Sequence, residues 1–196
     1  MTETIMHCFD PGKAGEEGKI IGSLLAGYGE LELELTSCLI ATTGDFDASL
    51  KTLFRIQSAE KRINKADELM KSEYAKAGLG IACSQSISDM HWCRKIRNQY
   101  AHCQWYYTDI DGLCFVNLEA IAKKRAPLTN IGSHKLRLAV DLLTRQMDFY
   151  VYLRKCFWYL AESYQRRASQ LKDPGAKLRS PVYPMPQVMA RPPLHY

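Results

Sequence analysis

The sequence predicts an all-α fold, a bundle of four main helices with a β-hairpin inserted after the third helix. Long stretches place apolar residues three and four positions apart, which is the helical period. Glycine-containing breaks at Gly44 and at residues 77–80 divide these stretches. Between the third and fourth stretches, two aromatic and β-branched runs flank Asp111-Gly112, a pair typical of tight hairpin turns.

The first helix is expected over residues 18–42. Its apolar residues are Ile20, Ile21, Leu24, Leu25, Tyr28, Leu31, Leu35 and Leu39. The segment ELELEL within it also alternates with period two, but leucine and glutamate form helices more readily than strands. We expect Gly44 to end this helix and Asp45 or Asp47 to cap the next one.

A second helix is expected over residues 47–77 and a third over residues 81–104, separated by the break AGLG. The hairpin is expected at residues 105–118, with a loop after it. A fourth helix, over residues 133–170, follows from another run of apolar residues at helical spacing.

The ends of the chain differ from this central part. We divide the sequence into an N-terminal extension (residues 1–17), a helical domain (residues 18–171) and a proline-rich tail (residues 172–196). The tail carries most of the eight prolines and has no helical period. It is therefore expected to be extended or disordered and dispensable for folding.

Charge and cysteine content limit the classes of function. The net charge is +5, yet the first fifty residues carry two lysines against nine acidic residues. This asymmetry indicates either a basic face that meets phosphate or an acidic helix packed beside basic ones. Seven cysteines, an odd number without a CxxC pair, favour reduced thiols in the cytoplasm. No secretory signal, membrane span, metal site or cofactor motif is predicted.

The segment RKIRNQYAHCQW, residues 94–105, combines a cation, an amide and an imidazole. On an ideal helix Asn98 and His102 share a face, so Asn98 could orient the imidazole or contact phosphate. Arg97 and His102 lie about 140° apart around the axis. A two-fold dimer could bring two such pairs into one cleft. Histidine can transfer protons near neutral pH, and arginine can stabilise a negatively charged phosphorane.

Arg97-Asn98-Gln99-Tyr100-Ala101-His102 resembles the R-x4-6-H signature of the HEPN superfamily, including the asparagine after the arginine and the alanine before the histidine. The order of long helices, with a hairpin after the motif, is also similar. The resemblance implies a HEPN-like bundle and a metal-independent, dimeric endoribonuclease, often a toxin or an effector of phage defence or stress. It implies catalytic roles for Arg97, Asn98 and His102. In some HEPN toxins a tyrosine two residues after the histidine is modified by the partner, whereas this chain has Gln104 there.

The resulting hypothesis is RNA cleavage by a cytoplasmic homodimer, with RNA as substrate, possible control by an antitoxin or other neutralising protein, and no membrane partner. Arg94 and Lys95 are predicted to bind RNA phosphates, unless they are only solvated. Trp105 and its two tyrosine neighbours either stack on bases or pack internally, and Glu32 either pairs with Arg97 or lies at the surface. The alternative function is that of a non-catalytic helical adaptor or a nucleic-acid- or nucleotide-binding interaction protein.

Overall fold

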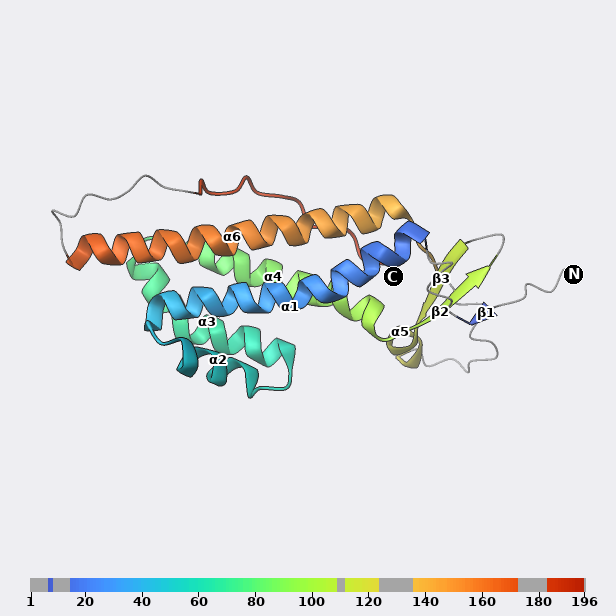
Figure 1. The fold of residues 1–196 in the computed structure, drawn as a ribbon, viewed down its shortest axis with the longest axis horizontal. Helices are drawn as coiled ribbons and strands as arrows, with labels where there is room; N and C mark the ends of the chain where they lie inside the picture. Colours follow the sequence, from blue (N-terminus) through green and yellow to red (C-terminus); the bar gives the residue numbers. More distant parts are fainter. Residues whose placement is uncertain (1–6, 9–14, 109–111, 124–135, 173–182, 196) are drawn as a thin grey trace, which may run out of the picture. The chain divides into compact units, whose positions relative to one another are not determined.

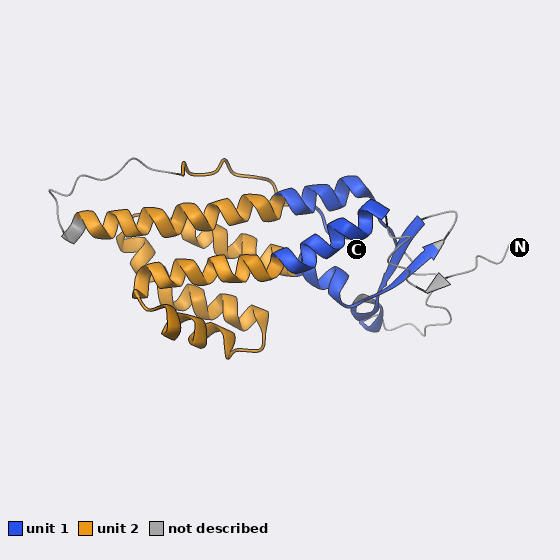
Figure 2. Ribbon diagram, viewed as in Figure 1, with its two compact units in different colours: residues 1–27, 95–148, 192–196 blue, residues 28–94, 149–191 orange. Residues whose placement is uncertain are grey.

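The computed structural model describes residues 7–8, 15–108, 112–123, 136–172 and 183–195, and it is mostly helical with a small antiparallel sheet (Figure 1). The chain divides into two compact units (Figure 2). Unit 1 comprises residues 1–27, 95–148 and 192–196, and unit 2 comprises residues 28–94 and 149–191. The described part of the chain therefore has the helical character that the apolar spacing predicts.

Helix α1, Gly15–Thr43, confirms the first expected helix and is slightly longer than predicted. Gly44 follows it with a positive φ of 72°, which a residue without Cβ adopts at no steric cost. The Asp45 carboxylate then accepts a hydrogen bond from the Ala48 amide at 2.9 Å, as the sequence predicts for one of its two candidate caps.

The expected second helix, over residues 47–77, is wrong as a single element. The chain forms α2, Phe46–Phe54, and α3, Ala59–Lys76. Ser58 caps α3 by accepting a hydrogen bond from the Lys61 amide, and Arg62 donates a hydrogen bond to the Ile56 carbonyl at 2.8 Å. Both interactions require a non-helical connection, so the side chains of Ser58 and Arg62 favour two helices over one.

Helix α4, Gly80–Ala101, follows Gly78, whose φ is 68°. It ends three residues before the predicted position. Helix α6, Val140–Lys172, confirms the last long helix but begins later than residue 133. Leu136–Arg137 forms strand β4 instead, and residues 133–135, like most of the predicted loop before them, lie outside the described residues.

The predicted hairpin is confirmed by strands β2, Cys103–Thr108, and β3, Gly112–Asn117. The sheet is larger than a hairpin, because β1, His7–Cys8, pairs with β2, and β4 pairs with β3, giving the order β1-β2-β3-β4. The short helix α5, Leu118–Ala122, follows β3 directly. Neither edge strand was predicted, since each contributes only two residues to the sheet.

The core of unit 2 joins α1, α3, α4 and α6. Buried polar groups link these helices: the Tyr74 hydroxyl donates to the Cys38 carbonyl at 3.1 Å, and the Tyr150 hydroxyl donates to the Cys93 carbonyl at 2.9 Å. The surrounding buried apolar side chains include Leu31, Leu35, Leu39, Ile63, Met70, Met90, Leu153, Phe157 and Leu160. Burial on this scale is the main favourable contribution to the stability of the unit.

The core of unit 1 lies between the sheet and the helical segments of that unit, and it is aromatic. Phe115 lies 5.7 Å from Tyr100, 5.6 Å from Trp105 and 5.3 Å from His195, measured between ring centroids. Aromatic pairs at such separations contribute roughly 0.5–1.5 kcal/mol beyond area burial. His195, near the end of the tail, is therefore part of this core.

Residues 183–195 of the tail contain no helix or strand but make specific contacts. Arg191 forms an ion pair with Asp89 at 2.8 Å. Gln146 donates a hydrogen bond to the Pro193 carbonyl at 2.9 Å, and the His195 amide donates to the Gln99 side chain at 3.0 Å. These contacts argue against the expectation that the tail is dispensable for folding. The sequence did not indicate them, because they depend on single polar groups rather than on an apolar period.

None of the helices in the described ranges combines the length and the apolar character that crossing a bilayer requires.

Candidate functional site

The Arg97–His102 motif lies where α4 ends and β2 begins. Arg97 and Asn98 belong to the last turns of α4 and are half-buried. Because α4 ends at Ala101, His102 stands in the turn that follows, immediately before β2. The ideal-helix geometry expected for Asn98 and His102 therefore does not extend to His102.

Asn98 engages the arginine beside it. The Arg97 Nη1 atom donates a hydrogen bond to Asn98 Oδ1 at 3.1 Å. Among the described residues, no hydrogen bond joins Asn98 to His102. Asn98 therefore restrains the Arg97 guanidinium, a role that the sequence did not suggest, and it does not hold the imidazole.

A carboxylate that the sequence analysis missed lies close to the imidazole. Glu119, in α5, places Oε1 4.0 Å from His102 Nε2. The two side chains are 49% and 54% exposed, so both are accessible to a large polyanionic ligand. The hairpin register explains the approach: Cys103 pairs with Asn117, so the residues just before β2 and just after β3 are neighbours. The predicted hairpin, over residues 105–118, begins after His102 and ends before Glu119, so it did not indicate this contact.

The interior positions of the motif serve the core of unit 1. Gln99 and Tyr100 are each 1% exposed, and the Tyr100 hydroxyl donates to Gln146 Oε1 at 2.6 Å. Burial raises the pKa of Tyr100 above its ordinary value. Trp105 packs on the Tyr100 and Phe115 rings, which supports internal packing over base stacking for this side chain.

The two predicted RNA-binding cations differ in their surroundings. The Arg94 side chain is 19% exposed and pairs with Glu60 at 3.2 Å, within unit 2. Lys95 is exposed and belongs to unit 1. A phosphate would compete with Glu60 for Arg94, whereas Lys95 is presented at the surface.

Glu32 neither pairs with Arg97 nor lies exposed at the surface, which were its two expected roles. It forms an ion pair with Arg62 at 2.7 Å, and the two side chains are only 12% and 18% exposed. Its carboxylate therefore binds α1 to α3 inside unit 2. The sequence did not indicate this pairing, because Glu32 and Arg62 are 30 residues apart and other cations, such as Lys51 and Arg55, lie between them.

Six cysteines of the described ranges form no disulfide, and each is buried or half-buried: Cys38, Cys83, Cys93, Cys103, Cys114 and Cys156. Burial raises the pKa of Cys83 and of Cys103 to about 12. A thiol with such a pKa is a poor nucleophile near neutral pH. Within the described ranges, no three histidine, cysteine or acidic side chains gather as metal ligands.

Comparison with protein-family models, with curated proteins and with solved structures found no match to this chain. Function is therefore inferred from the side chains at and just after the end of α4. These offer a permanent cation, an exposed imidazole and a carboxylate beside that imidazole. Such a set can neutralise a phosphate and transfer protons to and from its oxygen substituents.

Proposed function

We propose that the protein is a metal-independent endoribonuclease that cuts RNA by attack of a 2′-OH on the adjacent phosphate. The observation that carries the proposal is the exposed His102 imidazole beside Glu119, one short turn after the Arg97–Asn98 pair. The resemblance of the six-residue motif to the HEPN signature supports the same assignment. The reaction would take place in the cytoplasm.

In this mechanism a base removes the proton of the 2′-OH, and the resulting alkoxide forms a bond to phosphorus. The bond from phosphorus to the 5′ oxygen then breaks, and an acid protonates that oxygen, leaving a 2′,3′-cyclic phosphate. His102 supplies proton transfer. Arg97, restrained by Asn98, stabilises the charge of the phosphorane. Glu119, whose Oε1 lies 4.0 Å from His102 Nε2, would orient the imidazole.

The proposal requires two copies of the chain. The reaction needs a base and an acid at once, whereas each motif contains one histidine. A two-fold dimer would place two exposed His102 side chains beside one phosphate. Lys95, which is exposed on the same helix, would contact the RNA backbone.

The test is cleavage of a fluorescent RNA in excess EDTA, with the product ends identified by mass spectrometry. We expect a 2′,3′-cyclic phosphate and no cleavage of a substrate that is 2′-deoxy at the cut site. His102→Ala should lower the rate by roughly 10²–10⁴ and Arg97→Ala by roughly 10²–10³. Arg145→Ala is the matched control, because Arg145 is an exposed arginine paired with Asp141 in α6.

Cleavage that is unchanged in a clean His102→Ala preparation would show that His102 is not the catalytic group. A protein that is monomeric by light scattering at micromolar concentration would refute the two-histidine arrangement. RNA binding without cleavage in every variant would support the alternative, an adaptor that binds nucleic acid. The ion pair between Arg191 of the tail and Asp89 of α4, both in unit 2, favours a second kind of adaptor, one that binds a protein segment.

A further inference from the structure

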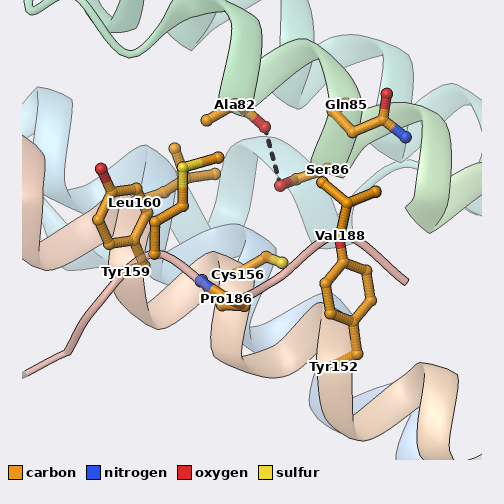
Figure 3. Close-up of a pocket in the computed structure, with 10 residues that line it drawn as sticks. Ala82, Gln85, Ser86, Tyr152, Cys156, Tyr159, Leu160, Pro186 and Val188 are labelled. Carbon is orange, nitrogen blue, oxygen red and sulfur yellow. Dashed lines mark hydrogen bonds between the residues drawn. The ribbon is translucent and has the colours of Figure 1, made fainter.

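Residues 183–191, called the strap below, lie over the groove between α4 and α6 in unit 2 (Figures 1 and 3). Beneath the strap, Pro186 and Val188 help to close a cavity of about 30 Å³. Its other walls come from α4 and α6, including Ser86, Tyr152 and Cys156. This space holds little more than one small group, so the strap already fills most of the groove.

Arg191 anchors the strap to a buried acid. Asp89 is 1% exposed, and its Oδ1 accepts a hydrogen bond from Arg191 Nε at 2.8 Å. Arg191 Nη2 donates to Ser88 Oγ at 2.6 Å, and the guanidinium lies 5.6 Å from the centre of the Trp92 ring. Gln85 Nε2 donates to both Asp89 oxygens, at 3.1 and 3.2 Å. The Asp89 carboxylate, the Ser88 hydroxyl and the face of the Trp92 ring together match the hydrogen-bonding and stacking capacity of an arginine side chain.

The rest of the strap buries little of its own apolar surface. Val188 is 71% exposed, Met185 is 56% exposed and Tyr183 is 45% exposed. A segment that belonged only to the core would turn these side chains inward. An extended, proline-containing segment held by one charged anchor is instead the arrangement seen when a folded surface binds a peptide. Proline lowers the entropy that such a segment loses on binding.

We propose that Asp89, Ser88, Gln85 and Trp92 form an arginine-recognition site for an extended, proline-rich peptide, and that the strap is its built-in ligand. The partner that fits is a protein segment with an arginine about five residues after a proline, the spacing of Pro186 and Arg191. Such a segment would displace the strap and take over the anchor at Asp89. This site is separate from the Arg97–His102 motif and does not depend on RNA cleavage.

The experiment uses the full-length chain and a fluorescein-labelled peptide, YPMPQVMAR, which has the sequence of the strap. Fluorescence anisotropy measures its affinity for the wild type and for Arg191→Gln, whose built-in anchor is weakened. We expect Arg191→Gln to bind the peptide at least tenfold more tightly than the wild type does. Adding Asp89→Asn to Arg191→Gln should remove that gain. Arg145→Gln, a substitution at an exposed arginine in α6, should behave like the wild type.

A second peptide, YPMPQVMAQ, tests whether the site recognises arginine. Because the change is made in the peptide, the protein itself is the same in both measurements. It should bind Arg191→Gln at least tenfold more weakly than the arginine peptide. This comparison decides the question even if the Asp89→Asn protein does not fold. Equal binding of both peptides would overturn arginine recognition. Absence of binding to every variant would show that the strap is a permanent part of the fold and not an exchangeable ligand.

Discussion

The Glu32–Arg62 ion pair provides the sharpest test of the packing in unit 2. Arg62 Nε and Nη2 donate to Glu32 Oε1 at 3.0 and 2.7 Å, and Nη1 donates to the Ile56 carbonyl. The guanidinium also lies 5.4 Å from the centre of the Phe54 ring. One side chain thus joins α1, α3 and the connection between α2 and α3. Replacing Arg62 with methionine keeps much of the volume but leaves the Glu32 carboxylate without its cation.

The magnitude follows from the burial of both partners. Leaving one member of a fully buried pair alone costs about 3–5 kcal/mol. Because Glu32 is 12% and Arg62 18% exposed, we expect the lower end, about 3 kcal/mol for Arg62→Met. Glu32→Gln keeps a neutral acceptor and should cost about 1 kcal/mol. The double variant should cost about 2 kcal/mol less than the two single variants added together, since no buried charge is left unpaired.

The assay is urea denaturation, followed by far-ultraviolet circular dichroism, of the wild type, Arg62→Met, Glu32→Gln and the double variant. Lys51→Met is the matched control. Lys51 and its partner Asp47 are 55% and 72% exposed, so this substitution should cost about 0.5 kcal/mol. The reasoning is refuted if the effects of Arg62→Met and Glu32→Gln add to within about 0.5 kcal/mol, as for independent sites. It is also refuted if Arg62→Met costs no more than Lys51→Met.

Two further predictions concern the tail. Removing residues 173–196 should lower the melting temperature by roughly 4–8 °C, because the charged hydrogen bonds of Arg191 alone contribute about 2 kcal/mol. An unchanged melting temperature would support the expectation from the sequence that the tail is dispensable for folding. Burial lowers the pKa of His195 below its ordinary 6.5, so the unfolded chain binds this proton more readily and stability should fall as the pH drops below about 6.5. Calorimetry from about pH 7.5 to about pH 5 should show a smaller fall for His195→Phe, and equal falls in both proteins would contradict this assignment.

Local patterns of the sequence were enough to predict the long helices α1, α4 and α6 and the hairpin. Tyr28, Leu31, Leu35 and Leu39 of α1 are buried as their spacing indicates, whereas Leu33, which falls outside that spacing, is 49% exposed. The hairpin was found because Gly112, with a φ of 69°, follows an aspartate between two strand-like runs. In each case the deciding residues are close together in the chain.

Interactions between distant residues account for what the sequence did not reveal. Residues 55–58, Arg-Ile-Gln-Ser, contain one apolar residue, and Arg62 donates a hydrogen bond to its carbonyl where the predicted helix is interrupted. Arg191 and Asp89 are 102 residues apart, and no periodicity marks either one. Glu119 reaches His102 only through the register of the strands between them. A charged side chain can be recognised in a sequence, but its partner is fixed by the fold.

The six-residue motif itself shows why sequence and structure must be combined to judge the site. Gln99 and Tyr100 are each 1% exposed and are bonded to Gln146, so their identity is explained by the core of unit 1 alone. Arg97, Asn98 and His102 are half-buried or exposed. Their contacts among the described residues, the Arg97–Asn98 hydrogen bond and the approach of Glu119 to His102, do not involve the aromatic core of unit 1. Substituting Gln99 or Tyr100 should therefore lower stability, whereas substituting Arg97 or His102 should leave the fold intact. Loss of RNA cleavage at constant stability would then be attributable to chemistry rather than to unfolding.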